Sequence, residues 1–513
     1  MAASDIASHR CQVCGKSRFG KRGNCLAHYL GIDIGTSAVK AVIVNEAQGA
    51  VAEAELALAV QRRHPGWSEQ NPQDWWRAVE NVLDELRAKV PRVMPRIEAI
   101  GLSGQMHGAV LLGADMQPLR PAMLWNDARS GAEAERLAQD NPDLPGIVGV
   151  VPMPGLTAPK IPWLARHEPE ILEKLHKIIL PKDYIRLQMT GECITDMSDA
   201  AGTWWLDQAR RDWCDAALAA TGLTRAQMPR LVEGHAVAGH LSRDLALRWG
   251  LRPGIPVAGG GGDAAAGAVG IGAINPGDAF LSLGTSGQLF VTTPDYRPAP
   301  ADMVHAFCHA LPGRWFQMGA MLSAASCLAW AADVFGVSAE VLAQEAQASY
   351  LGPSSLLFLP YLTGERTPHN DPNAKGVLFG INPATTRAEI TQAIMEGVAF
   401  SFADARDALA QSGTLVERAG VIGGGTRSQL WLQIISDLLG IELVRYRASA
   451  RGPAFGAARL AMLAATGADP ARVCTPPEIE GTIVPRFAVT LAYAPRIQRY
   501  RRLYRALKPE FAA

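Results

Sequence analysis

One glycine-rich stretch carries an acidic residue in a setting that could do chemistry. Residues 258–267 read AGGGGDAAAG, so that four glycines lead into Asp263 and small residues follow it. Such a stretch either cradles phosphate through its backbone amides or turns the chain so that one carboxylate is presented to a ligand. The first role makes an anion site, whereas the second makes a candidate general base. These residues alone do not separate the two interpretations.

Two other segments place hydroxyl side chains in a turn between apolar strands. Residues 29–45 (YLGIDIGTSAVKAVIVN) and 279–293 (AFLSLGTSGQLFVTT) each predict a strand, a Gly-Thr-Ser turn and a second strand. The copies lie about half the chain apart, which indicates two related lobes. Each turn would present hydroxyls and amides to a cleft between the lobes, where they could hold the phosphates of a nucleotide from both sides. The first turn lacks the GxxxxGK[ST] and GxGxxG patterns of P-loop and Rossmann sites.

Asp33 lies among apolar residues in the first of these strands. A carboxylate in that setting is costly unless it is paired or bound to a cation. Because it lies beside the expected phosphate turn, we predict that Asp33 holds Mg²⁺, directly or through water. The alternative is an aspartate that only stabilises its own turn.

The segment IGGGTRSQLW (422–431) follows an apolar strand and opens a helix. Its glycines would let the backbone approach a flat ligand, and the helix N-terminus adds amide donors. Glycine turns before helices are frequent, so this segment alone carries little weight. Together with the two Gly-Thr-Ser turns it predicts an adenosine pocket, with Gly424, Gly425 and Gln429 as candidate contacts.

The segment SGQMHG (103–108) follows an apolar strand in the first half of the chain. Gln105 and His107 could hydrogen-bond sugar hydroxyls, and Met106 could pack on the carbon face of a sugar; a plain structural role is the alternative. Three further polar segments are equally consistent with turn capping and with substrate contact: WND (125–127), PKDY (181–184) and TDMSDAAGT (195–203).

The composition favours a large globular protein. The chain has 513 residues, 48% hydrophobic and 19% charged, which predicts two large or three smaller domains. Lys and Arg together number 49, as do Asp and Glu, so no charge excess points to nucleic acid or to an anionic membrane. The sequence shows no signal-peptide pattern and no membrane-spanning run, and five of its eight cysteines are scattered, so we expect a cytoplasmic protein.

The first 28 residues stand apart from the rest of the chain. Cys11, Cys14, Cys25 and His28 form a C-x2-C…C-x2-H arrangement, a spacing that can bind zinc. A disordered extension, or a start assigned too early, is the alternative. Farther along, we expect an amphipathic helix over residues 71–90, a buried helix around 319–337 and a basic amphipathic helix at the C-terminus.

Two long segments resemble the signatures of a known family. GLTAPKIPWLARH (155–167) and GVLFGINPATTRAEITQAIME (376–396) are similar to those of the FGGY carbohydrate kinases, and the resemblance extends from Tyr29 to the C-terminal helix. Within that family, segments such as WSEQNPQDWW, LWNDAR, FLPYLTGERTPHN and RGPAFGAARLA most resemble kinases of D-xylulose. Glycerol kinases carry an Arg-Glu pair where this chain has Met106 and His107, which disfavours glycerol.

The resemblance implies an α/β fold with two actin/Hsp70-like (ribonuclease H-like) lobes and an active site in the cleft between them. It implies transfer of the γ-phosphate of ATP, with Mg²⁺, to the 5-hydroxyl of D-xylulose. By motif match, Asp263 is the general base and contacts the sugar with Gln105, Met106 and His107. The remaining matched residues contact ATP. Thr36, Ser37 and Thr285 meet phosphate oxygens, and Gly35 and Gly284 lie in the same turns. Gly424 and Gly425 border the adenosine beside Gln429.

We accordingly divide the chain into an N-terminal extension (1–28), a sugar-binding lobe (29–254), a nucleotide-binding lobe (255–490) and a C-terminal helix (491–513). The expected partners are the sugar and ATP, without nucleic acid or membrane, and a homodimer is the assembly to test.

One position departs from the family pattern. Kinases of D-xylulose generally carry Asn after the aspartate that Asp263 matches, whereas this chain has Ala264. Loss of that amide could weaken sugar binding or leave room for water or another substrate. A kinase of a related ketose or polyol therefore stays open, as does a nucleotide-switching ATPase of the same superfold.

Overall fold

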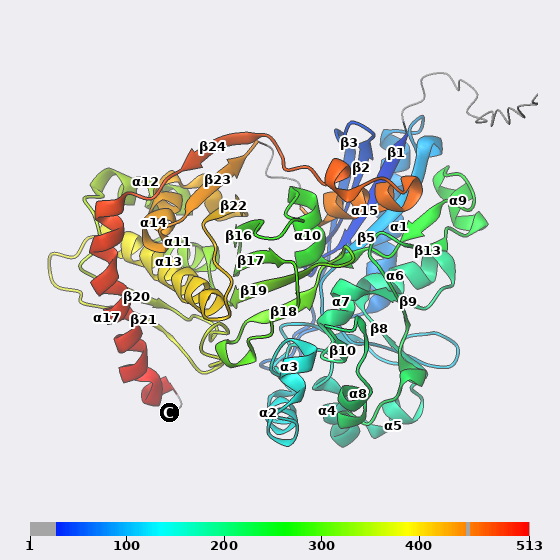
Figure 1. Ribbon diagram of the computed structural model, residues 1–513, viewed down its shortest axis with the longest axis horizontal. Helices are drawn as coiled ribbons and strands as arrows, with labels where there is room; N and C mark the ends of the chain where they lie inside the picture. Colours follow the sequence, from blue (N-terminus) through cyan, green and yellow to red (C-terminus); the bar gives the residue numbers. More distant parts are fainter. Residues whose placement is uncertain (1–26, 448–451, 512–513) are drawn as a thin grey trace, which may run out of the picture.

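Two lobes, each built around a seven-stranded sheet, make up the computed structural model, which describes residues 27–447 and 452–511 (Figure 1). The first sheet has the strand order β13-β14-β5-β1-β2-β3, and β15 also pairs with β5. The second has the order β18-β19-β17-β16-β22-β23-β24. The strands of the first sheet are β1 (His28–Ile34), β2 (Ala38–Asn45), β3 (Ala50–Ala57), β5 (Ile97–Gly104), β13 (Val237–His240), β14 (Pro256–Ala258) and β15 (Gly261–Gly262). Those of the second are β16 (Ala279–Leu283), β17 (Gly287–Thr293), β18 (His305–Cys308), β19 (Trp315–Met321), β22 (Arg418–Ile422), β23 (Glu442–Tyr446) and β24 (Ile479–Ile483).

The two sheets repeat one topology. In the first, β3, β2 and β1 form an antiparallel meander, and β5 and β14 continue it in parallel. In the second, β19, β17 and β16 form the same meander, followed in parallel by β22 and β23. The predicted strand–turn–strand units are the β1–β2 and β16–β17 hairpins, so the internal repeat predicted from the sequence is confirmed.

The β1–β2 hairpin has a clear local cause. Every residue of β1 is buried, because the strand lies between β2 and β5 and both faces of the sheet are covered by helices. Its apolar run therefore continues without alternation, interrupted only by Gly31 and Asp33. The turn that follows is short, and the amide of Gly35 donates to the carbonyl of Ala38 at 3.0 Å.

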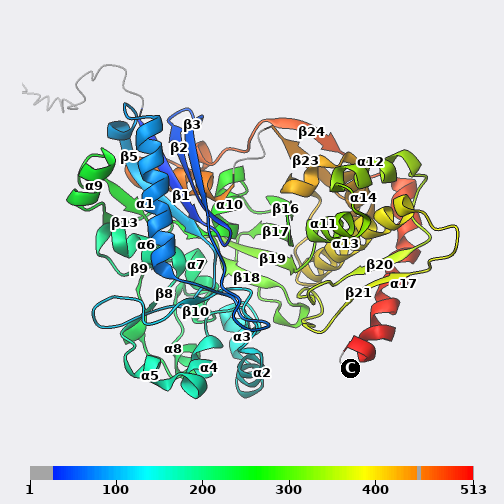
Figure 2. The ribbon, with the colours of Figure 1, turned by 180° about the vertical axis from the view of Figure 1, so that it is seen from behind.

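Helices cover both faces of the first sheet. The amphipathic helix predicted over 71–90 is α1 (Pro72–Lys89), capped by the side chain of Asn71, and it packs on one face (Figure 2). On the other face lie α10 (Asp263–Ile271) and α15 (Pro453–Thr466), which also contact each other (Figure 1). The chain therefore returns from the second lobe to complete the core of the first.

This return changes the domain boundaries. The division expected between residues 254 and 255 falls inside the first sheet, because β14 and β15 both pair with β5. The passage to the second lobe instead follows α10, and α15 belongs by its packing to the first lobe. The division into consecutive ranges did not assign α15 to the first lobe, because nothing in the sequence of α15 indicates which sheet it covers.

Glycines allow the close approach of α15 to the first sheet. A Cβ atom at Gly101 of β5 would lie 1.9 Å from the carbonyl oxygen of Ala457, and one at Gly31 of β1 would lie 1.9 Å from that of Ala454. A Cβ at Gly456 would likewise lie 1.7 Å from the carbonyl oxygen of Ala266 on α10. A side chain at Gly31 or Gly101 would push α15 away from the sheet, and one at Gly456 would push α15 away from α10, whose first residue is Asp263.

Helices surround the sheet of the second lobe. The central one is α13 (Arg387–Gln411), with α11 (Ala325–Phe335), α12 (Ala339–Ser349) and α14 (Gln429–Leu439) around it. The expected C-terminal helix is α17 (Phe487–Phe511), which buries three tyrosines against this lobe and contacts α14 and β20 (Leu357–Pro360) (Figure 2).

The single buried helix expected around 319–337 is wrong. Residues up to Met321 belong to β19, and the helix α11 begins only at Ala325. The apolar run is too short and too uniform to distinguish a strand from a helix by periodicity. Trp330 is also 43% exposed, because it lies beside a large cavity.

Shorter elements connect these layers. The remaining strands are β4 (Glu69–Gln70), β6 (Val110–Leu112), β7 (Ala122–Met123), β8 (Lys177–Ile179), β9 (Ile194–Asp196), β10 (Leu206–Asp207), β11 (Asp212–Trp213), β12 (Arg230–Val232) and β21 (Gly376–Phe379). The remaining helices are α2 (Gly131–Asp140), α3 (Leu144–Val148), α4 (Lys160–His167), α5 (Pro169–Glu173), α6 (Pro181–Thr190), α7 (Met197–Ala201), α8 (Asp215–Ala220), α9 (Arg243–Trp249) and α16 (Pro470–Val473), with 3-10 turns η1 (Met94–Arg96), η2 (Arg225–Gln227), η3 (Pro300–Asp302) and η4 (Gly424–Arg427). Within 27–447 and 452–511, no single helix is long and apolar enough to cross a membrane; the pair α11 and α12 would be by length and composition, but it bends by 97°.

Candidate active site

A cavity of about 170 Å³ lies where the two lobes meet. Its wall combines side chains that are far apart in the sequence, including one carboxylate, two histidines and an arginine. The residues are Thr36, Met106, His107, Trp125, Asp263, Ala264, Ser286, Gly287, Gln288, His305, Met318, Ala320, Met321, Leu322 and Arg366. Of the predicted substrate contacts, the structure thus brings Met106, His107 and Asp263 together.

The glycine stretch before Asp263 turns the chain and does not cradle phosphate. The amides of Gly259 and Gly260 donate to backbone carbonyls at 2.8 Å, and that of Gly262 donates to Ser198 Oγ at 3.2 Å. These donors are therefore already used within the protein. Gly260 has a φ of +77°, and a Cβ there would lie 2.1 Å from the carbonyl oxygen of Leu102. The second interpretation of the stretch, presentation of Asp263, fits this geometry.

Asp263 is a half-buried carboxylate at the start of α10. Its Oδ1 accepts a hydrogen bond of 2.8 Å from the amide of Ala264. Burial raises the pKa of Asp263 to about 6, and the bond from Ala264 acts in the opposite direction. The group is thus ionised near pH 7 but is close enough to its pKa to exchange a proton.

Asp33 lies near the end of β1 and is buried. Burial, and next the charge of Asp263, raise the pKa of Asp33 to about 7, whereas Ser103 on the adjacent strand lowers it. Oδ1 of Asp33 has no hydrogen-bond partner in the described parts of the chain. Two carboxylates that repel each other in a poorly hydrated site are stabilised by a cation.

The donor set fits Mg²⁺ better than it fits a metal held by protein ligands alone. No group of three or more His, Cys, Asp or Glu side chains among the described residues could hold a metal ion. Mg²⁺ is usually bound by one or two carboxylates together with phosphates and water, and the unpartnered oxygen of Asp33 meets that requirement. The predicted zinc cluster cannot be compared in this way, because Cys11, Cys14 and Cys25 lie outside the described residues; His28 begins β1.

His107 is held in an unusual backbone conformation, with a φ of +70°. Its carbonyl accepts hydrogen bonds from Lys160 Nζ at 2.8 Å and from Thr157 Oγ1 at 3.2 Å. Its Nδ1 lies 2.6 Å from the carbonyl oxygen of Gly202, which can only accept, so Nδ1 carries the proton. Burial holds the pKa of His107 well below its usual range, so the ring is neutral and Nε2 is left as a hydrogen-bond acceptor.

Lys160, which lies in the first signature segment, fixes this wall of the cavity. It is fully buried and donates also to the carbonyls of Met123 and Gly155, both at 3.1 Å. Burial lowers its pKa to about 7. The signature therefore positions the backbone around His107 and contributes no side chain to the cavity lining.

Gln105 does not line the cavity, although the sequence predicted a sugar contact. Its Oε1 accepts from Thr36 Oγ1 at 2.8 Å, and its Nε2 donates to Gln70 Oε1 at 2.9 Å. Thr36 Oγ1 in turn accepts from Trp125 Nε1 at 3.0 Å. Gln105 thus lies behind Thr36 and Trp125 and fixes their orientation, a role that the sequence did not reveal.

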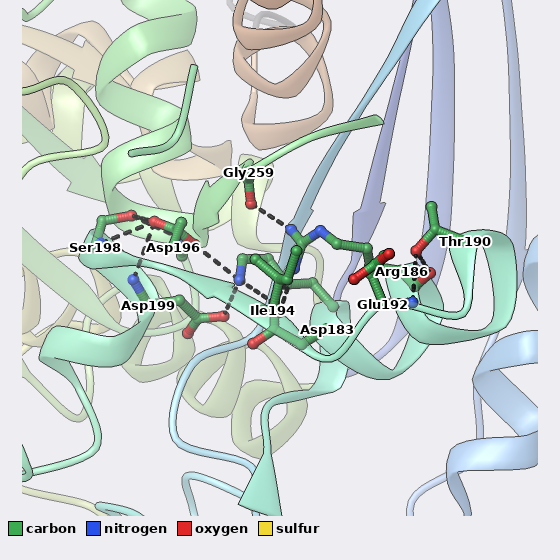
Figure 3. Close-up of polar contacts among 11 residues, drawn as sticks. Asp183, Arg186, Thr190, Glu192, Ile194, Asp196, Ser198, Asp199 and Gly259 are labelled. Carbon is green, nitrogen blue, oxygen red and sulfur yellow. Dashed lines mark hydrogen bonds and ion pairs between the residues drawn. The ribbon is translucent and has the colours of Figure 1, made fainter. Parts of the chain in front are cut away.

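A buried ionic network supports the glycine stretch from below (Figure 3). Lys182 Nζ lies 2.6 Å from Asp183, 2.8 Å from Asp196 and 3.0 Å from Asp199, and all four side chains are fully buried. Burial acts to raise the pKa of Asp183, but Lys182 and Arg186 outweigh it and lower that pKa. Burial raises the pKa of Asp199 well above its usual range.

Two contacts join this network to the glycine stretch. Arg186, which is paired with Asp183 at 2.5 Å, donates to the carbonyl of Gly259 (Figure 3). Ser198 Oγ donates to Asp196 at 2.5 Å and accepts from the amide of Gly262. The PKDY and TDMSDAAGT segments, for which capping and substrate contact were both open, thus form a buried support and do not line the cavity.

A second, larger cavity of about 1,240 Å³ opens in the second lobe. Five predicted nucleotide contacts line it: Gly284, Thr285, Gly424, Gly425 and Gln429. The other walls come from α11, α12 and α14, among them Trp330 and Asp333 of α11, and Arg427 of η4 also lines the cavity. Gly35 and Ser37, also predicted to contact the nucleotide, lie in the β1–β2 turn and line neither cavity, and Ser37 is exposed.

The glycines after β22 have a packing role that the sequence did not suggest. A Cβ at Gly425 would lie 2.5 Å from Leu283 Cγ, and one at Gly423, where φ is +99°, would lie 2.6 Å from the backbone of Leu283. Gly424 has no such contact, its nearest neighbour being the far end of Arg427 at 3.9 Å. Gly423 and Gly425 therefore let η4 pack on β16, and Gly424 is the one with open space toward the cavity.

Sequence reasoning also missed residues of the second lobe that line the smaller cavity. His305 and Arg366 are the chemically informative ones, and Gln288 and Ser286 accompany them. His305 lies in a largely apolar segment, and neither its type nor its spacing to His309 was recognised as a site. Arg366 lies in GERTPHN, which contributed only to the family resemblance.

We predict that Lys182→Met lowers the free energy of unfolding by about 3–5 kcal/mol, because three buried carboxylates would lose their shared cation. Urea denaturation measures the change, and Lys174→Met, at an exposed lysine, is the matched control. Equal stability of the two variants would contradict the support assigned to the network.

Two family models match the chain. The N-terminal domain of the FGGY family of carbohydrate kinases matches residues 28–270, and the C-terminal domain of that family matches residues 279–465. The matches meet between α10 and β16, where the structure passes from one lobe to the other.

Known proteins resemble the chain over almost its whole length. A xylulose kinase of Escherichia coli (strain K12) is 46% identical over 486 residues, which are 94% of this chain and 100% of that protein. A solved structure from Brucella ovis, named as a xyloylose kinase, has a TM-score of 0.91 at 49% identity and covers 94% of this chain and 99% of its own. The xylulose kinase from Rhodospirillum rubrum has a TM-score of 0.87 at 28% identity, covering 95% and 100%. These similarities confirm the predicted actin/Hsp70-like two-lobe fold, and the chain belongs to the FGGY family of carbohydrate kinases.

Proposed function

We propose that this carbohydrate kinase transfers the γ-phosphate of ATP to the 5-hydroxyl of D-xylulose. One observation carries the arrangement: a single turn, Gly284–Gly287, contributes to both cavities. Gly284 and Thr285 line the larger one, and Ser286 and Gly287 line the smaller one that contains Asp263. ATP in the larger cavity would therefore direct its terminal phosphate toward a sugar in the smaller one.

In this proposal, Asp263 accepts the proton of the attacking hydroxyl. The hydroxyl oxygen forms a bond to the γ-phosphorus, the bond to the bridging β–γ oxygen breaks, and ADP leaves with that electron pair. Asp263 suits the role because its raised pKa, about 6, still leaves it ionised at neutral pH. Asp33 would hold Mg²⁺, which when bound offsets the negative charge of the phosphates.

The smaller cavity supports a sugar as the acceptor. His107 offers Nε2 to a hydroxyl, while Met106 and Met318 supply apolar contact for the carbon chain. A nucleotide-switching ATPase would need no such cavity. D-xylulose is the substrate that the named relatives favour, since the proteins of Escherichia coli and Rhodospirillum rubrum are both named xylulose kinases.

The cellular setting belongs to the proposal as well. The cysteines in the described chain are all free, as expected in a reducing compartment where ATP is abundant, and we propose that the enzyme acts in the cytoplasm. A homodimer stays a prediction.

A sugar panel tests the substrate. Release of ADP is coupled to a spectroscopic signal and measured with D-xylulose, other ketoses and polyols at equal concentration. We expect D-xylulose to give the highest kcat/KM. A signal for D-xylulose no greater than for ATP alone, with another sugar active, would overturn the substrate; hydrolysis of ATP that no sugar changes would overturn the kinase.

Asp263→Asn tests the base. We expect kcat to fall about 10²–10⁴-fold, because the amide cannot accept the hydroxyl proton. The KM for ATP should stay within about threefold of the original value, because the larger cavity is unchanged. Asp244→Asn, at an exposed aspartate of α9, is the control. A turnover in Asp263→Asn equal to that of this control would exclude the role.

A further inference from the structure

His305 brings the edge of the second sheet to the sugar cavity. It lies on β18, opposite Met318 of β19, and both residues line the cavity. The next residue, Ala306, donates its amide to the carbonyl of Gly149 in the first lobe at 2.9 Å. Backbone hydrogen bonds therefore hold β18 both to β19 and to Gly149, which fixes the position of His305 relative to the first lobe.

Both ring nitrogens of His305 lack a hydrogen-bond partner in the part of the chain that the structure describes. The residue is only 1% exposed, so water at the protein surface does not satisfy them. Buried polar atoms are almost always paired, because an unpaired one forfeits its hydration without compensation. An unpaired imidazole that lines a cavity points to a ligand in that cavity.

The charge state of His305 defines what it can bind. Burial, and next the neighbouring Arg366, lower its pKa to about 3, so the ring is neutral at physiological pH. A neutral imidazole has one N–H donor and one acceptor nitrogen. That is the same pair of functions that a side-chain amide offers, and Ala264, on the same cavity beside Asp263, presents only a methyl group.

We propose that His305 binds an oxygen of the sugar directly and determines affinity for it, in place of an amide at position 264. The proposal rests on the assignment of the smaller cavity to the sugar. The group bound is a hydroxyl or carbonyl oxygen, since both can pair with the imidazole. Phosphate oxygens of ATP are disfavoured as the bound group, because a neutral ring offers them no positive charge. Ser286 and Gly287 are also nearer than His305 to the nucleotide cavity, since they adjoin Gly284 and Thr285 in the turn.

Two variants of His305 separate binding from packing. His305→Phe keeps a ring of similar shape but removes both nitrogens, whereas His305→Gln keeps a donor and an acceptor. We expect His305→Phe to raise the KM for D-xylulose at least about tenfold while the KM for ATP stays within about twofold. His305→Gln should recover most of the loss. The control is His309→Phe. His309 lies four residues farther along the chain and is also fully buried, but it does not line the cavity.

A second variant tests the exchange with position 264. Ala264→Asn installs an amide on the same cavity, so it should lower the KM for the sugar more in the His305→Phe background than in the original protein. Additive effects of the two substitutions would contradict the proposed exchange.

Other outcomes identify the error. A sugar KM unchanged by His305→Phe, or raised equally by Phe and Gln, would overturn the proposal, and a change confined to the KM for ATP would assign His305 to the nucleotide. Thermal unfolding of each variant shows whether it folds. If His305→Phe does not fold, the KM for the sugar is compared between His305→Gln and Ala264→Asn, which still compares the two donors. Should the panel identify another sugar, these measurements use that sugar, so failure of D-xylulose does not decide the role of His305.

Discussion

The repulsion between two poorly hydrated carboxylates, Asp33 and Asp263, is the constraint on which the site depends. Burial disfavours the charge on each, and the charge of Asp263 further raises the pKa of Asp33. The fold keeps them close nonetheless: Asp33 is fixed by the strand pairing of β1, and Asp263 by its place at the start of α10. This arrangement explains both the affinity for a cation and the ability to accept a proton, because a bound cation or a bound proton reduces the unfavourable negative charge.

Much of the protein serves to hold Asp263 in that position. From one side, α15 returns from the far end of the chain and packs on α10 and on the glycines of β1 and β5. From the other, the Lys182 network fixes the glycine stretch through Arg186 and Ser198. Buried ion pairs contribute little net stability, but they hold a fixed geometry well when every partner is present.

The repeated hairpins were predictable because their signal is local. A run of apolar residues, a Gly-Thr-Ser turn and a second run define each strand pair within 15 to 17 residues, and the spacing of the copies revealed the two lobes. The glycine stretch leading to Asp263 was recognisable for the same reason. The contacts of Met106 and His107 with the cavity also follow from their place at the end of a strand.

The remaining features depend on distant parts of the chain. The packing of α15 on the first sheet, the turn of Gln105 toward Gln70, and the pairing of Lys182 with three aspartates all join segments that no periodicity connects. Gly425 was interpreted only as a ligand contact, because a glycine looks the same in sequence whether a ligand or a leucine approaches it. His305 carried no signal at all, since its meaning comes from the cavity beside it.

The pKa of Asp33, measured by infrared difference spectroscopy of its carboxyl group in the unliganded protein, tests the central claim most directly. Asp33→Asn identifies the band, and the titration is compared between the original protein and Asp263→Asn. The account predicts ionisation of Asp33 near pH 7 in the original protein and at clearly lower pH in Asp263→Asn, because the repelling charge is gone. The same midpoint in both proteins would contradict it.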